Sequence, residues 1–144
     1  MVIALLGVAG AGKTTIAKAM EKYIANAVVI DGDELRAETN NLDISMQGRE
    51  ANMHLGFTRA RALSDAGHTV FVAMQAPIKK IREQYLTDED MQILVINNGE
   101  NPKDKLGYND NFDPDYSGVE NEIVLQDFSP EWFNSVFIPH LDKR

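Results

Sequence analysis

Residues 7–14 read Gly-Val-Ala-Gly-Ala-Gly-Lys-Thr, and this stretch decides the fold of the chain. It has the G-x-x-x-x-G-K-T pattern of a phosphate-binding loop. The apolar run at 2–6 predicts a short strand before it, and the residues from Thr15 onward have helical composition and spacing. Strand, glycine loop and helix form the context that the motif requires. The sequence therefore predicts a nucleoside triphosphate site.

Each part of the loop has a chemical reason. Glycines let the backbone turn its N–H groups around an anion, and the helix N-terminus adds favourable partial charge. Lys13 is expected to reach the outer phosphates, and the Thr14 hydroxyl to ligate Mg²⁺. We expect the nucleotide to contact a set of residues in and just after the loop: Gly7, Ala9, Gly10, Ala11, Gly12, Lys13, Thr14 and Thr15.

The composition is that of an ordinary globular protein. The 144 residues are 44% hydrophobic and 25% charged, enough for one domain with a real core. No apolar run approaches the roughly 20 residues that cross a bilayer, and the apolar start 1–6 lacks a basic leader. We therefore expect a core strand rather than a signal peptide, no membrane partner and a cytoplasmic location. The absence of cysteine excludes disulfides and thiolate metal sites.

The net charge of −8 is unevenly distributed. Residues 1–82 hold ten Lys/Arg and eight Asp/Glu, whereas 83–144 hold four Lys/Arg and fourteen Asp/Glu. This asymmetry places the capacity to bind anions in the first half of the chain. It argues against a broad nucleic-acid surface.

Strand and helix patterns alternate along the chain. Strands are expected at 2–6, 27–30, 70–73, 91–96 and 123–125. Helices are expected from the loop to about Ala25, from the Asp31-Gly32-Asp33 cluster through Glu38, from about Arg49 to Ala66, at 78–85 and from Ser129-Pro130 onward. Gly67 is expected to end the third of these helices. Residues 97–120 are dense in turn formers and predict a long functional or lid loop. The pattern predicts an α/β three-layer sandwich with a parallel sheet, a P-loop NTPase fold in one domain over 1–144.

Two carboxylates follow the second predicted strand. Asp31 and Asp33 would lie at the carboxyl edge of the sheet, at the end of a strand next to the loop. One is expected to organise Mg²⁺ and one to accept the proton of an attacking hydroxyl; Thr14 and Asp33 are the expected metal residues. The alternative is that Asp33 only caps a helix starting at Glu34.

Three further side chains are candidates for an anionic acceptor. Arg36 follows Asp33 by three residues, so both lie on one helix face, and Asn52 likewise lies beside Arg49. A guanidinium there would hold an anion through parallel hydrogen bonds. A solvated face is the alternative for each arginine, and the favoured one for Arg59 and Arg61. His54 has no second ligand at metal-binding spacing.

The chain resembles the adenylylsulfate kinases, which use ATP and Mg²⁺ to phosphorylate the 3′-hydroxyl of adenosine 5′-phosphosulfate. Beyond the loop, residues 30–36 are similar to the family's L-D-G-D-x-x-R segment, and 42–45 fall where it has L-G-F-S. Arg49 and Asn52 match the R and N of D-R-x-E-N-x-R. Residues 72–77 resemble the strand before I-S-P, and 111–116 are loosely similar to the acceptor loop. The likeness covers residues 1–85.

The resemblance implies a small-molecule kinase acting in sulfate assimilation. Lys13, Asp31 and Asp33 would be its catalytic residues. Arg36, Ile44, Arg49 and Asn52 would hold the phosphosulfate nucleotide, with Ile44 in place of a stacking phenylalanine. A homodimer is a further expectation, although the extension before the first strand that carries the dimer contacts in many relatives has no counterpart in this sequence.

This chain departs from the family pattern at several positions. Ile44, Ala51, His54 and Ala76 stand where the family has Phe, Glu, Arg and Ser. The family's basic lid has no counterpart, because residues 83–142 hold no Arg and only Lys103 and Lys105. Each lost cation at a phosphoryl site can cost orders of magnitude in rate.

Three functions follow from these observations. The leading one is an adenylylsulfate-type kinase in which Lys13, with Lys103 or Lys105, shields the phosphates. The second keeps the kinase but changes the acceptor to a nucleoside, a nucleotide or a modified DNA base, which the substitutions favour. The third is a nucleotide-binding protein without turnover, which the missing lid cations favour.

Overall fold

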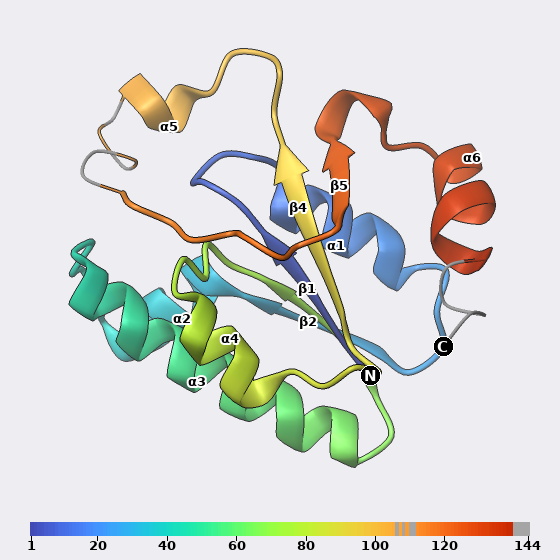
Figure 1. Cartoon of the computed structure of the whole chain (residues 1–144), viewed down its shortest axis with the longest axis horizontal. Coiled ribbons are helices and arrows are strands. Elements are labelled where there is room, and N and C mark those ends of the chain that lie inside the picture. Colours follow the sequence, from blue (N-terminus) through green and yellow to red (C-terminus); the bar gives the residue numbers. More distant parts are fainter. Residues whose placement is uncertain (106, 108, 110–111, 140–144) are drawn as a thin grey trace.

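Five parallel strands form one sheet with helices on both faces (Figure 1). The computed structural model describes residues 1–105, 107, 109 and 112–139. The strands lie in the order β2-β3-β1-β4-β5. Their bounds are β1 Val2–Leu6, β2 Ala27–Asp31, β3 Thr69–Ala73, β4 Met91–Ile96 and β5 Asn121–Val124.

The helices divide between the two faces of the sheet. Figure 1 shows α1 and α6 on one side and α2, α3 and α4 on the other. Their bounds are α1 Lys13–Glu21, α2 Gly32–Thr39, α3 Met46–Asp65, α4 Lys79–Tyr85, α5 Pro102–Lys105 and α6 Pro130–Trp132, with a 3₁₀ turn η1 at Leu125–Asp127 and a π-helical turn η2 at Phe133–Phe137. The predicted α/β three-layer sandwich is confirmed.

Strand β1 is the centre of the core. All five of its residues are buried, because β3 and β4 pair with its two edges and helices cover both faces. Ile3 and Leu5 pack with Ile16 and Phe133 on one face. The alternate residues of β1 face the opposite way, into a second cluster that includes Phe57 of α3. This strand therefore joins the loop that follows it to the buried centre of the fold.

Several element boundaries differ from the sequence expectation. Helix α1 ends at Glu21 rather than about Ala25, because the chain turns before β2, with Asn26 at φ 57°. Helix α3 begins at Met46 rather than about Arg49, because the Ser45 hydroxyl caps it by accepting from the Gly48 N–H. The expected loop at 97–120 contains the short helix α5. Gly67, at φ 101°, follows the end of α3 as expected.

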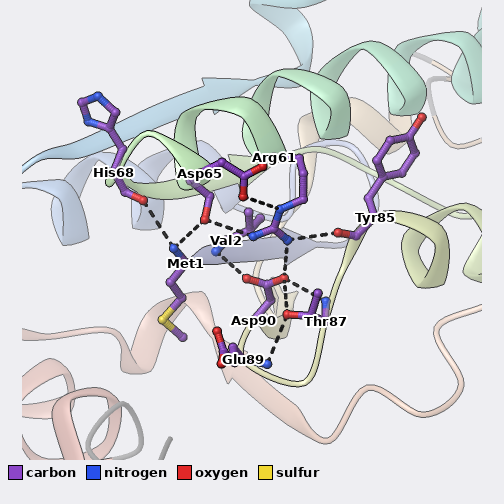
Figure 2. A network of polar contacts seen from close by, with 10 residues as sticks. Met1, Val2, Arg61, Asp65, His68, Tyr85, Thr87, Glu89 and Asp90 are labelled. Atoms are coloured by element: carbon purple, nitrogen blue, oxygen red, sulfur yellow. Dashed lines mark hydrogen bonds and ion pairs between the residues drawn. The ribbon is translucent and has the colours of Figure 1, made fainter.

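A buried polar network ties the amino-terminal edge of the sheet together (Figure 2). The side chain of Asp90 is 1% exposed and accepts hydrogen bonds from the Val2 N–H and from the Arg61 guanidinium at 2.8 and 2.7 Å. Asp90 also accepts from the N–H and hydroxyl of Thr87. The expectation that Arg61 lies on a solvated face is therefore wrong. Arg61 instead stabilises the edge of the sheet opposite the phosphate loop through its contact with Asp90.

Candidate functional site

The phosphate loop joins β1 to α1 at the carboxyl edge of the sheet (Figure 1). Gly12 lies at φ 105°, where a side chain would be strained, and a Cβ there would lie 2.7 Å from Leu125. The Lys13 ammonium donates to the carbonyl oxygens of Gly7 and Val8 at 2.9 and 2.7 Å. Burial lowers the pKa of Lys13 to about 8, although Asp33 and Asp31 act in the opposite direction. This lysine is therefore buried beside two carboxylates, at the position where the motif binds phosphate.

A direct contact joins the loop to the acidic pair. The Thr14 hydroxyl donates to Oδ1 of Asp31 at 2.8 Å. The two oxygens are neighbours, and Mg²⁺ is commonly held by one or two carboxylates together with substrate phosphates and waters. Thr14 and Asp31 are therefore the residues that would hold a magnesium ion. This contact favours Asp31, rather than the expected Asp33, as the carboxylate nearest the cation.

The strand order that brings Asp31 and Asp33 close to the phosphate loop differs from the expectation. Strand β2 was expected beside the loop strand, but β3 lies between β1 and β2. Helix α1 contacts both β2 and β3, and its first turn therefore brings Thr14 to Asp31. Helix α2 begins at Gly32, with Asp31 as its N-cap residue, so Asp33 lies in its first turn. The alternative that Asp33 only caps a helix starting at Glu34 is therefore wrong.

The four candidate acceptor residues lie together. Arg49 is 3% exposed, and burial and the nearby Arg36 lower the pKa of its guanidinium. Its guanidinium carbon lies 4.5 Å from the centre of the Phe112 ring. Arg36 donates to the carbonyl of Asp43 at 2.9 Å, which holds the segment before α3 near the side of the site. Ile44, from this segment, is 48% exposed.

Asn52 presents an unsatisfied acceptor atom. Its side chain is 7% exposed, and Nδ2 donates to the Gly32 carbonyl at 3.2 Å. This bond fixes the amide orientation, because only the nitrogen can donate. Within the described part of the chain, Asn52 Oδ1 has no hydrogen-bond partner. Buried polar atoms are normally paired, so this oxygen suits a ligand that carries a hydrogen-bond donor.

All these groups border one cavity of about 360 Å³. Of the predicted nucleotide residues, Gly7 and Ala11 do not line it: both are buried in the body of the loop. The remaining predicted site residues line the cavity, namely Ala9, Gly10, Gly12, Lys13, Thr14, Thr15, Asp31, Asp33, Arg36, Ile44, Arg49 and Asn52. The side chains predicted to bind phosphate and those predicted to hold an anionic acceptor thus line the same cavity.

The sequence interpretation missed the residues that hold the cavity wall at 73–76. Arg82, 1% exposed, donates to the carbonyls of Ala76 and Asp115 at 2.7 and 2.9 Å. The Tyr116 hydroxyl donates to the Gln75 carbonyl at 2.6 Å, and burial raises the pKa of this phenol. Ala76 has a φ of 42°, which costs energy for a residue with a side chain. No local pattern distinguishes Arg82 from an exposed helical arginine.

Other singled-out residues lie away from the cavity. His54 lies 2.7 Å from the Tyr85 hydroxyl through Nδ1. Arg59 forms an exposed pair with Glu38 through two short hydrogen bonds, which confirms the surface interpretation for this arginine. Among the described residues, none of the helices combines the length and apolar character that crossing a bilayer requires.

The fold and the cavity define the class of P-loop kinase folds, in which a glycine loop faces an acceptor site across the carboxyl edge of a parallel sheet. Comparison with known proteins narrows this class. The family model described as adenylylsulphate kinase matches residues 1–96. This chain therefore belongs to the adenylylsulfate kinase family, as the resemblance of the phosphate loop and the D-G-D segment indicated.

Curated relatives support the same family. The adenylyl-sulfate kinase of Lactiplantibacillus plantarum is 33% identical over 104 residues, which make up 66% of this chain and 50% of that protein. The enzyme of Rippkaea orientalis is 37% identical over 86 residues, or 56% of this chain and 47% of that protein. The chain therefore spans about half the length of the curated relatives it matches.

Solved structures extend the likeness of fold to nearly the whole chain. The Mycobacterium tuberculosis APS kinase CysC, solved with AMPPNP and APS, has a TM-score of 0.71 at 22% identity, covering 99% of this chain and 97% of that one. Shikimate kinase from Aquifex aeolicus has a TM-score of 0.57 at 15% identity, covering 99% and 97%. At these identities the likeness shows the P-loop kinase fold alone.

Proposed function

We propose that this chain is an ATP-dependent kinase of the adenylylsulfate type, which converts ATP and adenosine 5′-phosphosulfate to ADP and 3′-phosphoadenosine 5′-phosphosulfate. One observation carries the proposal: Lys13, Thr14 and Asp31 line the same cavity as Arg36, Arg49 and Asn52. A phosphate cradle alone would bind a nucleotide. A second group of cationic and polar side chains facing it supplies a place for an anionic acceptor.

The residues divide the chemistry between them. The loop and Lys13 hold the phosphates of ATP, and Arg36 and Arg49 hold the anionic end of the acceptor. The acceptor hydroxyl oxygen forms a bond to the γ-phosphorus as the bond from that phosphorus to the β–γ bridging oxygen breaks. Asp33 takes the hydroxyl proton, since Asp31 is occupied by Thr14. Mg²⁺, held by Thr14 and Asp31, would neutralise charge on the phosphates.

Membership of the kinase family supports the reaction class. The identity of the acceptor depends on the positions at which this chain differs from the family pattern. Ile44, which stands where the family has a stacking phenylalanine, lies between the main cavity and a second one of about 640 Å³ that Leu42 and Arg36 also line. This open, partly apolar side favours a second candidate: a kinase for another hydroxyl acceptor, such as a nucleoside, a nucleotide or a modified DNA base. ATP as phosphoryl donor is expected for both, as is a cytoplasmic location.

The test is a product assay on the purified chain with ATP and Mg²⁺. Adenosine phosphosulfate and a panel of nucleosides, nucleotides and hydroxymethylated bases would be offered, and ADP and the phosphorylated product quantified. A 3′-phosphorylated product from adenosine phosphosulfate supports the proposal. A product from another acceptor alone favours the second candidate. ATP binding with no transfer to any acceptor would instead identify a nucleotide-binding protein without turnover.

A further inference from the structure

Three asparagines from the segment after β4 lie against the phosphate loop. Asn97 donates to the Gly10 carbonyl at 3.3 Å, and Asn101 to the Ala9 carbonyl at 2.8 Å. Asn109 pairs with Ala9 twice: its Nδ2 donates to the carbonyl at 3.1 Å, and its Oδ1 accepts from the N–H at 2.9 Å. We call Asn97, Asn101 and Asn109 the amide clamp. Figure 1 shows α5, within this segment, beyond the carboxyl end of β4.

The clamp fixes the orientation of a peptide unit in the loop. Two carboxamides hold the Ala9 carbonyl, and in a trans peptide the next N–H points in the opposite direction within the peptide plane. The Gly10 N–H is thereby turned away from the clamp. The approach is close: a Cβ on Gly10 would lie 2.0 Å from Oδ1 of Asn101, and Gly10 itself has a φ of 82°. Gly10 is thus required by the clamp as well as by the backbone conformation.

The amide clamp also positions the positively charged side chain of Lys103 at the cavity. Oδ1 of Asn101 accepts from the Lys103 N–H at 3.0 Å, so the residue that holds Ala9 also fixes the backbone of Lys103. The Lys103 stem lies against Gly10, with Cγ 2.8 Å from the place of a Cβ there. Lys103 lines the cavity together with Lys13. Its charge is among the causes that lower the pKa of Lys13, after the larger effect of burial.

We propose that Lys103 is a phosphate-contacting residue of the nucleotide site, positioned there by the amide clamp. The ammonium groups of Lys13 and Lys103 line one cavity and repel each other. A polyphosphate bound between them would attract both, and this attraction would outweigh the repulsion. Lys103, held in place by uncharged asparagines, would thereby supply a positive charge near the phosphates. The family's basic lid, which has no counterpart in residues 83–142, would otherwise supply such charge. The inference rests on the proposed function for its ligand, a nucleoside triphosphate.

The test is the affinity of the chain for Mg·ATP and for AMP, measured by titration calorimetry. Charge-assisted contacts to phosphate are the strong hydrogen bonds, so Lys103→Ala is expected to weaken Mg·ATP binding about tenfold or more. Binding of AMP, which lacks the outer phosphates, should change less than threefold. Lys103→Arg should restore much of the ATP affinity. Lys22→Ala, which removes an exposed lysine at the end of α1, is the matched control and should change neither affinity.

A double-mutant cycle tests the role of the clamp. Asn101→Ala alone should weaken Mg·ATP binding, and the effects of Asn101→Ala and Lys103→Ala should be clearly less than additive, because Asn101 fixes the backbone of Lys103. Melting temperatures check that each variant is folded. Equal ATP affinity of the wild type and Lys103→Ala would overturn the proposal. These readouts need no turnover, so they stand apart from a failure of the kinase assay.

Discussion

The Arg82 guanidinium donates a 2.7 Å hydrogen bond to the carbonyl of Ala76, a residue held at a φ of 42° in the wall of the cavity. The other branch of the same guanidinium holds Asp115 from a distant segment. A single buried arginine thus joins the cavity wall at Ala76 to a segment about 40 residues further along the chain.

We expect Arg82→Met to lower the free energy of unfolding by about 3 kcal/mol, because it leaves buried carbonyl groups without their donors. The relaxed wall should also raise the KM for the acceptor more than that for ATP. Urea unfolding followed by circular dichroism measures the first effect, and steady-state kinetics the second. Lys80→Met, an exposed change on the same helix, should stay within about 0.5 kcal/mol of the wild type. A loss below about 1 kcal/mol for Arg82→Met would contradict this account.

Lys13 should make nucleotide binding take up protons. Burial lowers its pKa to about 8 in the free protein, and a bound polyphosphate would raise that pKa. Binding of Mg·ATP at pH 8 is therefore expected to take up about half a proton, falling to about a tenth at pH 7. Calorimetry in buffers of different ionisation enthalpy measures this number. Proton release, or no dependence on pH, would be inconsistent with a buried lysine of lowered pKa.

The same lysine predicts the sign of a stability effect in the absence of nucleotide. The pKa of Lys13 in the folded chain lies below its unfolded value, so the unfolded chain binds more protons between pH 8 and about 10. Over this range the free energy of unfolding should rise with pH relative to that of Lys13→Met. Chemical unfolding of both proteins at several pH values tests the direction.

The two acidic residues are expected to separate by role. Asp31→Asn, which alters the partner of Thr14, should weaken Mg·ATP binding while leaving metal-free ATP binding little changed. Asp33→Asn should leave Mg·ATP affinity within about threefold, and lower kcat by about 10²–10⁴, the contribution typical of a general base. Titrations with and without Mg²⁺, paired with product assays, distinguish the two. The reverse pattern would exchange the assigned roles.

Asp90 should contribute to acid sensitivity. Burial alone would raise the pKa of its carboxyl, but hydrogen bonds from Val2, Thr87 and Arg61 outweigh it and lower the pKa. Its stabilising effect is therefore present above about pH 4 and lost as pH falls through the folded pKa. Asp90→Asn should lower the free energy of unfolding by about 2–3 kcal/mol at pH 7, and the difference from the wild type should shrink as the pH falls below about 4. Glu89→Gln, an exposed neighbour, serves as control.

The sequence predicts much of this molecule because its signals are local. The loop at 7–14 and the strand at 91–96 lie where their patterns indicate. Strand order was less accessible: apolar runs state which residues are buried but not which strand lies beside which, so the insertion of β3 between β1 and β2 was missed. The contacts of Arg82 and Asn109 are also long-range. An arginine in a short helix and an asparagine among turn formers look the same whether they face water or a distant carbonyl.

The polar network around Asp90 and Arg61 lies at one edge of the sheet, and the cavity lies at the other. Strand β1 passes directly from one to the other. The residues that hold the amino-terminal edge together and the residues that line the proposed acceptor site therefore lie at opposite edges of the sheet. If the chain is a kinase as proposed, substitutions at Ile44 and Ala76 can be screened for a changed acceptor while the network at the far edge stays intact.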